Sequence, residues 1–222
     1  MTKKALPTPA PPRLNADRLE EASLADIELL DEVDLHDLKL SGVAIGDATS
    51  GRFARLSWQG ARLGAVSWRR AQFEDTVFEK CDFANADGRE LYLSRVVIEG
   101  CRGVGFKAAE CNWRDVVCRE GNWSLAQFRY AKFERVRFEN LDLREADFQN
   151  ADLRGATFRD CDLREAQFSF ARLQGADFRT CQTEDIRIDA GALNGLNVSP
   201  LQAAQFATIL GLKVQWSDGD LT

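Results

Sequence analysis

Histidine is almost missing from this chain of 222 residues, in which His36 is the single example. Histidine is the commonest general acid or base in catalysis and the commonest metal ligand. No CxxC, HExxH or phosphate-binding glycine motif is present, and no serine stands in a nucleophile motif. The sequence therefore predicts a protein that is not an enzyme, with no catalytic residues, no cofactor and no metal site.

Long apolar runs are missing as well. No apolar stretch approaches the roughly 18 residues needed to cross a membrane. The N-terminal sequence MTKKALPTPAPP has two lysines but no apolar segment behind them, so it does not resemble a secretory signal. We expect no membrane association and a cytoplasmic location.

A strong charge of one sign is also missing from most of the chain. The net charge of −6 is concentrated in residues 1–50, which hold 10 acidic and 5 basic residues. Residues 51–198 hold 23 acidic and 23 basic residues, and residues 199–222 hold 2 acids and 1 lysine. Because the central part is neutral, an electrostatic function would have to come from local patterning.

What the chain does have is a repeat of five residues. Between residues 126 and 180 each group of five begins with a small or aliphatic residue and has Phe or Leu in third place. The third residues are Phe128, Phe133, Phe138, Leu143, Phe148, Leu153, Phe158, Leu163, Phe168, Leu173 and Phe178. A period of five fits neither a helix nor a flat strand. It suits a coil with four short sides, in which coils of about 20 residues stack at about 4.8 Å.

The same register continues, less regularly, back to Gly51. Every twentieth residue is then a large inward residue, as in the series Phe53, Phe73, Leu93, Trp113, Phe133, Leu153, Leu173 and Leu193. Four inward positions carry tryptophan, namely Trp58, Trp68, Trp113 and Trp123. We expect either that these coils bulge or that these indoles turn outward.

The six cysteines follow the repeat. Five of them occupy the small inward position, namely Cys81, Cys101, Cys111, Cys161 and Cys181, and Cys118 occupies the large one. In a cytoplasmic protein these are expected to be buried, reduced thiols that act as small hydrophobic residues.

Two stretches interrupt the register. The apolar pairs in residues 31–45 run two residues out of step, and a Gly/Asp/Ser-rich loop over 46–51 could absorb the shift. Residues 101–110 are either a poorly conforming coil or a projecting functional loop. The candidate loop residues are Asp47, Thr49, Phe106 and Lys107.

Both ends of a stacked coil need caps. We divide the chain into a disordered proline-rich tail (1–12), an N-terminal cap (13–30, a short helix or an early irregular coil), the repeat coils (31–198) and a C-terminal helix with its tail (199–222). The helix begins at Ser199-Pro200 and is apolar on more than one face. One face would cap the coils and another would form a homodimer, through Leu201, Phe206, Ile209, Leu210 and Leu212.

Acidic residues recur at two repeat positions. Glu145, Glu165 and Asp185 recur at every twentieth position, so they are expected to form an acidic row on one face, with Asp142 and Asp162 nearby. These five residues are the candidate partner-binding face. For the Asp residues at the second repeat position a structural role is an alternative, because Asp at a tight corner can bond nearby backbone N–H groups.

The repeat motif resembles the pentapeptide-repeat family, whose consensus is a small residue, Asp or Asn, Leu or Phe, and two polar residues. The resemblance implies an all-β fold, a right-handed quadrilateral parallel β-helix with a short C-terminal helix that caps the coils and dimerises. With the terminal helix VSPLQAAQFATILGLKV and the interruptions at 46–51 and 101–110, the chain is similar to the Qnr and MfpA types.

Those types imply a dimeric rod that mimics DNA, binds DNA gyrase or another type II topoisomerase, and so affects antibiotics that target the enzyme, without binding nucleic acid itself. The alternative is a rigid protein-interaction scaffold with no topoisomerase role.

Overall fold

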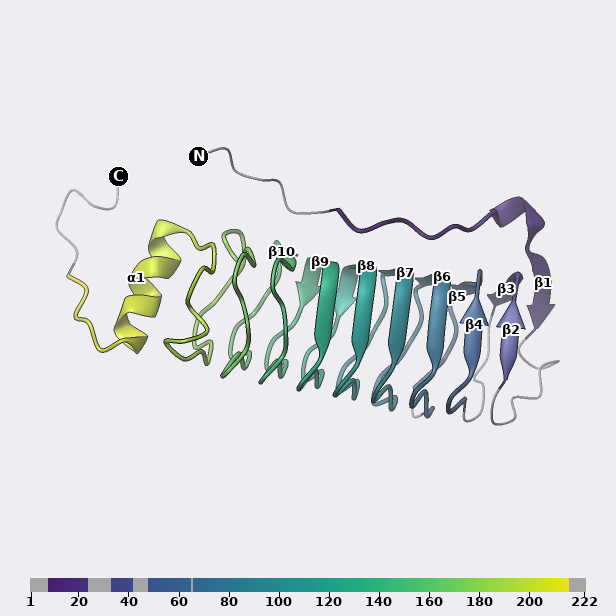
Figure 1. Cartoon of the computed structure of the whole chain (residues 1–222), viewed down its shortest axis with the longest axis horizontal. Coiled ribbons are helices and arrows are strands. Elements are labelled where there is room, and N and C mark those ends of the chain that lie inside the picture. Colours follow the sequence, from purple (N-terminus) through teal and green to yellow (C-terminus); the bar gives the residue numbers. More distant parts are fainter. Residues whose placement is uncertain (1–7, 24–32, 42–47, 65, 216–222) are drawn as a thin grey trace.

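The structure is a computed structural model that describes residues 8–23, 33–41, 48–64 and 66–215. Its elements are η1 (Ala16–Arg18), β1 (Glu20–Ser23), β2 (Asp34–His36), β3 (Leu38–Ser41), β4 (Arg52–Ala54), β5 (Ser57–Gln59), β6 (Gln72–Glu79), β7 (Tyr92–Glu99), β8 (Asn112–Asn122), β9 (Lys132–Asp142), β10 (Thr157–Arg159) and α1 (Pro200–Ile209). The coils lie side by side along one axis and form a rod, with α1 at the far end (Figure 1).

The strands of successive coils pair in parallel, in the order β1-β3-β5-β6-β7-β8-β9-β10, with β2 and β4 joined to β6 on a second side. From β6 to β9 each strand lies one coil after the strand it pairs with, so that Phe73, Leu93, Trp113 and Phe133 stand in register. Single bridges at the same spacing continue to the pair Asp177 and Asn197. The predicted right-handed, four-sided parallel β-helix is confirmed.

The corners of the coils are tight turns. The N–H of Ala86 donates to the carbonyl of Phe83 at 2.9 Å, and Asn85 between them has φ 59°. A positive φ at this place is the signature of a type II turn. Positive φ recurs at five-residue steps along the rod, mostly at residues other than glycine. Corner side chains point away from the core, and those on the same corner of neighbouring coils stand above one another.

The core is built from the large residues of the repeat. Phe138 stacks on Phe158 with ring centroids 4.7 Å apart, and Phe158 meets Phe178 at 5.0 Å. Phe148 likewise stacks on Phe168, with ring centroids 4.9 Å apart. The predicted stacking is confirmed, and the small residues at the first repeat position are buried beside these rings.

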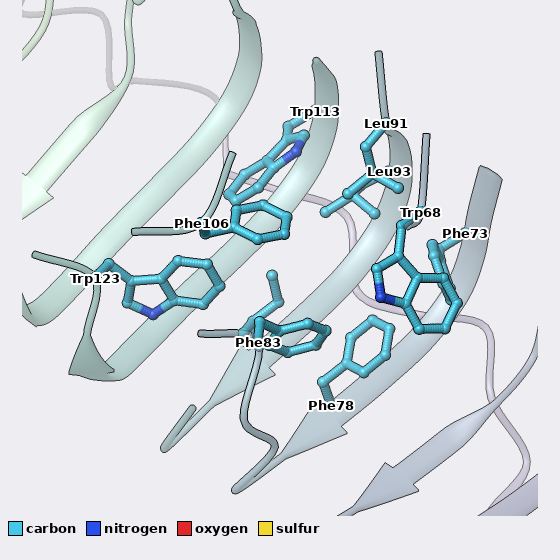
Figure 2. Close-up of a pocket in the computed structure, with 10 residues that line it drawn as sticks. Trp68, Phe73, Phe78, Phe83, Leu91, Leu93, Phe106, Trp113 and Trp123 are labelled. Carbon is cyan, nitrogen blue, oxygen red and sulfur yellow. The ribbon is translucent and has the colours of Figure 1, made fainter. Parts of the chain in front are cut away.

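Of the two alternatives for the tryptophans, that they turn outward is wrong. Trp58, Trp68, Trp113 and Trp123 are at most 2% exposed, and their indole N–H groups have no partner among the described residues. Glycine makes the room: a Cβ on Gly103 would lie 2.2 Å from Trp123. Figure 2 shows three of these indoles around an interior cavity of about 20 Å³ lined by aromatic and aliphatic side chains.

Residues 101–110 are a regular part of one coil and not a projecting loop. Arg102 and Lys107 bridge to the coils on both sides, and Phe106 is 3% exposed. Phe106 fits at a small position because Gly88 faces it, where a Cβ would lie 2.5 Å from the ring. Phe106 and Lys107 are therefore not loop residues. Thr49 lies with its Oγ1 3.1 Å from Ser67 Oγ, and Asp47 lies outside the described residues.

The six cysteines are all buried and unpaired, as the repeat predicts. Cys81 and Cys101 stand in neighbouring coils, and the N–H of Cys81 donates to Cys101 Sγ at 3.3 Å. Their thiols donate to backbone carbonyls close by, Cys81 to Glu79 at 3.4 Å and Cys101 to Glu99 at 3.3 Å. Burial raises the pKa of Cys118 well above its usual range. These thiols are therefore part of the packed interior.

The N-terminal coils are shorter than the later ones. Leu35 pairs with Phe53 and Leu40 with Trp58, whereas Phe53 itself pairs with Phe73. The difference is the two-residue shift that the sequence indicates. Within the predicted N-terminal cap, β1 pairs with β3, which favours the early-coil alternative for residues 20–23. Residues 24–30 lie outside the described part.

The predicted disordered tail is wrong for residues 8–12. This part of the chain lies along the rod, where the N–H of Ala10 donates to Asp115 Oδ1 at 3.1 Å. A proline-rich segment forms no sheet of its own, but its few N–H groups can be taken up by side chains of the coils.

The C-terminal helix α1 covers the last coil. Ser199 and Gln202 form a capping box at its start. The Gln202 side chain then donates to the carbonyls of Phe178 at 2.7 Å and Cys181 at 2.8 Å. Phe206, 4% exposed, packs on the core. The helix thus satisfies backbone groups that the last coil would leave unpaired.

Candidate protein-binding face

The aspartates at the second repeat position form a recurring unit with arginine. Asp142 Oδ1 accepts the N–H of Arg144 at 3.1 Å, and the Arg144 guanidinium bonds both carboxylate oxygens at 2.9 and 2.8 Å. Asp162 and Arg164 repeat this arrangement at 3.2, 2.9 and 2.6 Å. The same pairs form at Asp87/Arg89, Asp152/Arg154 and Asp177/Arg179.

This unit fixes the corner and cancels charge within each coil. The bonds from Arg144 lower the pKa of Asp142, and those from Arg164 lower the pKa of Asp162. Both carboxylates are ionised and paired at neutral pH. Asp142 and Asp162 therefore have the corner geometry of the structural alternative, and their charge is shared with arginine.

Glu145, Glu165 and Asp185, which we call the acidic ladder, are arranged differently. They occupy the same corner of successive coils, with φ between 55° and 60°, and all three are exposed. The N–H of Glu145 donates to the backbone carbonyl of Arg164, and the N–H of Glu165 donates to the backbone carbonyl of Glu184. Each corner therefore stands over the next. None of the ion pairs formed by the described residues includes them. They present like charges about 4.8 Å apart to solvent.

Large apolar side chains stand on the neighbouring corner. Tyr130 is 59% exposed and Phe170 is 72% exposed, two coils apart. Leu125, 48% exposed, continues the corner of the acidic ladder. The corner of the acidic ladder and the corner of Tyr130 and Phe170 bound one side of the rod. We call this side the ladder face; it consists of residues 125–130, 145–150 and 165–170 and of Asp185. Exposed aromatic residues are enriched at protein–protein contacts.

Sequence reasoning missed Tyr130 and Phe170. Both stand at the fifth repeat position, which between residues 126 and 180 otherwise holds polar residues or glycine, so a signal was present. An aromatic ring at a corner cannot enter the core, because the core is filled by the first and third positions of each repeat.

The predicted dimer residues divide into two groups. Leu201, Ile209, Leu210 and Leu212 are between 44% and 59% exposed, whereas Phe206 is buried on the core. The helix therefore caps the coils through Gln202 and Phe206 and leaves apolar side chains exposed at both of its ends.

Other classes of site find no support in the described part of the chain. It contains no group of three or more His, Cys, Asp or Glu side chains placed to hold a metal ion. His36 is exposed, with Nδ1 2.9 Å from Asp37 Oδ2. No described helix is long and apolar enough to cross a membrane.

The repeat places the chain among known proteins. The family model for a pentapeptide repeat region matches residues 71–148, and that for pentapeptide repeats matches residues 142–179 with 8 copies. No curated protein matches the chain.

Similar solved structures include QnrB1, a plasmid-mediated fluoroquinolone resistance protein, with 18% identity, a TM-score of 0.41 and coverage of 81% of this chain and 99% of that one. Another is HetL, a pentapeptide repeat protein involved in heterocyst differentiation regulation in the cyanobacterium Nostoc sp., with 15% identity, a TM-score of 0.34 and coverage of 78% and 90%. Residues 71–179 of this chain are therefore a pentapeptide-repeat region.

Proposed function

We propose that this protein is a non-enzymatic binding rod whose ladder face holds a partner protein, and that the partner is DNA gyrase or another type II topoisomerase in the cytoplasm. The observation that carries the proposal is the acidic ladder: three exposed carboxylates on one corner of consecutive coils, which form no ion pair with any residue of the described part of the chain and stand beside exposed aromatic side chains. Asp142, Asp152, Asp162 and Asp177 on these coils are paired with arginine.

The chemistry of the face defines the partner. A groove that binds DNA is lined with Lys and Arg, and a row of like-charged carboxylates on a rigid rod can enter it in place of phosphates. Tyr130 and Phe170 would add apolar anchors that DNA lacks. The partner must therefore offer a basic groove with an apolar edge.

The direct test measures binding to purified gyrase and its supercoiling activity, with and without a quinolone. The triple variant Glu145→Lys, Glu165→Lys and Asp185→Lys should abolish binding and leave the fold intact, because exposed corners contribute little to stability. The control variant Glu120→Lys, Glu139→Lys and Asp160→Lys changes the charge equally on another part of the rod and should bind like the parent. A parent that does not bind gyrase, or a triple variant that binds equally well, contradicts the proposal.

A scaffold for a different protein is the second candidate. It is favoured by the Asp–Arg units, which cancel much of the charge that a DNA mimic would use. In that case Tyr130 and Phe170 would carry the contact. A parent without effect on supercoiling would favour this candidate.

We also propose that the rod is a homodimer through the exposed apolar side chains of α1 and the segment that follows it. Five large apolar side chains are exposed at this end of the rod, namely Leu201, Ile209, Leu210, Leu212 and Val214. Light scattering should give twice the chain mass of 24.9 kDa. The double variant Leu210→Asp with Leu212→Asp should have the monomer mass. The control variant Gln215→Asp should keep the dimer mass. A parent protein that has the monomer mass at tens of micromolar would refute the dimer.

A further inference from the structure

Residues 8–15, which we call the strap, run along the outside of the rod from β9 back towards β1, against the direction in which the coils progress (Figure 1). The side chain of Arg137 donates to Thr8 Oγ1 at 3.1 Å. The N–H of Ala10 donates to Asp115 Oδ1 at 3.1 Å, and the N–H of Arg13 donates to Asp75 Oδ1 at 2.8 Å. The strap therefore contacts several coils through one corner.

The composition of the strap indicates a polyproline II conformation. Pro9, Pro11 and Pro12 fix their own φ angles and bias the residues before them towards extended backbone. Polyproline II has three residues per turn. In agreement with this period, Pro9 is buried and Pro12 half-buried, whereas Ala10 is exposed. The side of the strap that faces the rod thus carries a P-x-x-P pattern.

The spacing of the strap matches the spacing of the coils. From Ala10 to Arg13 a polyproline II segment advances by about 9.3 Å, at about 3.1 Å per residue. Asp75 and Asp115 are two coils apart, which is about 9.6 Å at the inter-strand distance. Between residues 9 and 13 only Ala10 and Arg13 have an N–H group, and the rod accepts both.

The acceptors belong to a row of alternating charge, Asp75, Arg95, Asp115 and Arg135, which we call the alternating ladder. Arg95 bonds Asp75 at 2.6 and 2.9 Å, and Arg135 bonds Asp115 at 2.7 and 2.8 Å. Both aspartate side chains are 10% exposed. Because each arginine holds its carboxylate in place, the two acceptors are fixed before any segment binds, which lowers the ordering cost of binding.

We propose that the alternating ladder is a docking site for P-x-x-P segments of a partner protein, and that the strap occupies this site in cis until such a segment displaces it. The strap leaves the side chains of Ala10 and Arg13 exposed, so the site recognises rod-facing prolines and the spacing of two N–H groups. A segment of another chain with this pattern offers the same groups. The site lies on a different corner from the ladder face and is independent of the function proposed there.

The test uses a fluorescent peptide with the sequence of residues 8–15 and the full chain carrying Ala10→Pro and Arg13→Pro. These substitutions remove the two donated N–H groups and keep the strap extended. The peptide should bind this variant in an anisotropy titration. It should bind the parent at least about tenfold more weakly, because a tethered strap competes at a millimolar effective concentration.

Two controls assign the binding to the alternating ladder. A peptide with proline at positions 10 and 13 should not bind, because it lacks both N–H groups. Adding Asp75→Asn and Asp115→Asn to the strap variant should weaken binding, because an amide oxygen accepts an N–H more weakly than a carboxylate does. Adding Glu145→Gln and Glu165→Gln should leave binding unchanged. Circular dichroism verifies that each variant keeps its β-helix.

Three results would overturn the proposal. The first is that the peptide binds neither the variant with Ala10→Pro and Arg13→Pro nor a full chain with Pro9→Asp and Pro12→Asp, in which the strap has lost its rod-facing prolines. Another is equal binding to the variant with the two Asp→Asn changes. The third is a parent whose mass halves when the strap is altered by Ala10→Pro and Arg13→Pro, since the strap would then be exchanged between copies and would not act in cis.

Discussion

The alternating ladder and the acidic ladder occupy equivalent left-handed corner positions of the same β-helix, yet they meet solvent differently. Asp75 and Asp115 are 10% exposed, paired with arginine and covered by the strap. Glu145, Glu165 and Asp185 are exposed and make no ion pair among the described residues. The backbone fixes where a corner side chain begins, and the charge of the neighbouring coil decides whether it can be covered.

The physical reason is the cost of removing charge from water. A carboxylate can be half-buried when a guanidinium and N–H groups bond it. Three like charges on one corner repel one another and have to stay hydrated until a cationic partner arrives. One ladder therefore suits an uncharged, proline-rich backbone, and the other suits a basic surface.

Breaking a pair in the alternating ladder should have the larger effect on stability. Arg135→Ala leaves Asp115 partly buried with a single N–H donor from the strap, and we expect a loss of about 1–3 kcal/mol in the free energy of unfolding. The matched change in the acidic ladder, Glu165→Ala, should stay within about 0.5 kcal/mol. Urea unfolding measures both. Equal losses would mean that the two corners do not differ as described.

Lowering the pH should weaken the binding of the strap gradually, with a smaller effect than the loss of Arg135. The bonds from Arg135 lower the pKa of Asp115, partly offset by burial and helped by the N–H of Ala10. At Asp75 burial raises the pKa, but the bonds from Arg95 and from the N–H of Arg13 outweigh it, so the pKa is also lowered. The bound strap thus favours the ionised forms. Its stabilisation is complete above the ordinary aspartate value of 3.8 and is lost as the pH falls through the lowered values.

The measurement is the pH dependence of the amide NMR signals of Ala10 and Arg13. They should keep their bound positions at pH 5 and above, roughly a unit over the ordinary value of 3.8, and shift only at more acidic pH. Other charged groups near the two carboxylates include Arg13, Arg55, Glu74, Arg114 and Glu134. The variant Asp75→Asn with Asp115→Asn should lose the transition. A transition near neutral pH would contradict the assignment to these carboxylates.

Much of the fold could be predicted because the repeat is local. The spacing of Phe138, Phe158 and Phe178 places them in one stack whatever the rest of the chain does, and the structure agrees. The tryptophans were harder, since an inward Trp123 depends on the space left by Gly103 in the next coil. Only the volumes of stacked neighbours decide that question.

The candidate sites were predicted unevenly for a similar reason. The acidic ladder follows from reading every twentieth position, but the pairing of Asp142 with Arg144 depends on side-chain direction at the corner. The strap gave no periodic signal. Its order comes from carboxylates that lie 62 and 105 residues further along the chain.

By itself the sequence determined the period, the inward residues and the parallel stacking, because these follow from which residues recur every five and every twenty positions. The place of the terminal helix followed from Ser199-Pro200, an N-cap with a first-turn proline. Tertiary structure alone decided which corners are neutralised, which are open and where the proline-rich segment lies. Those outcomes depend on contacts between groups far apart in the chain, whose energies are set by burial and by the charge of the facing coil. The alternating ladder also recurs at every twentieth position, so its row can be read from the sequence, but only the rod shows that the strap lies on it.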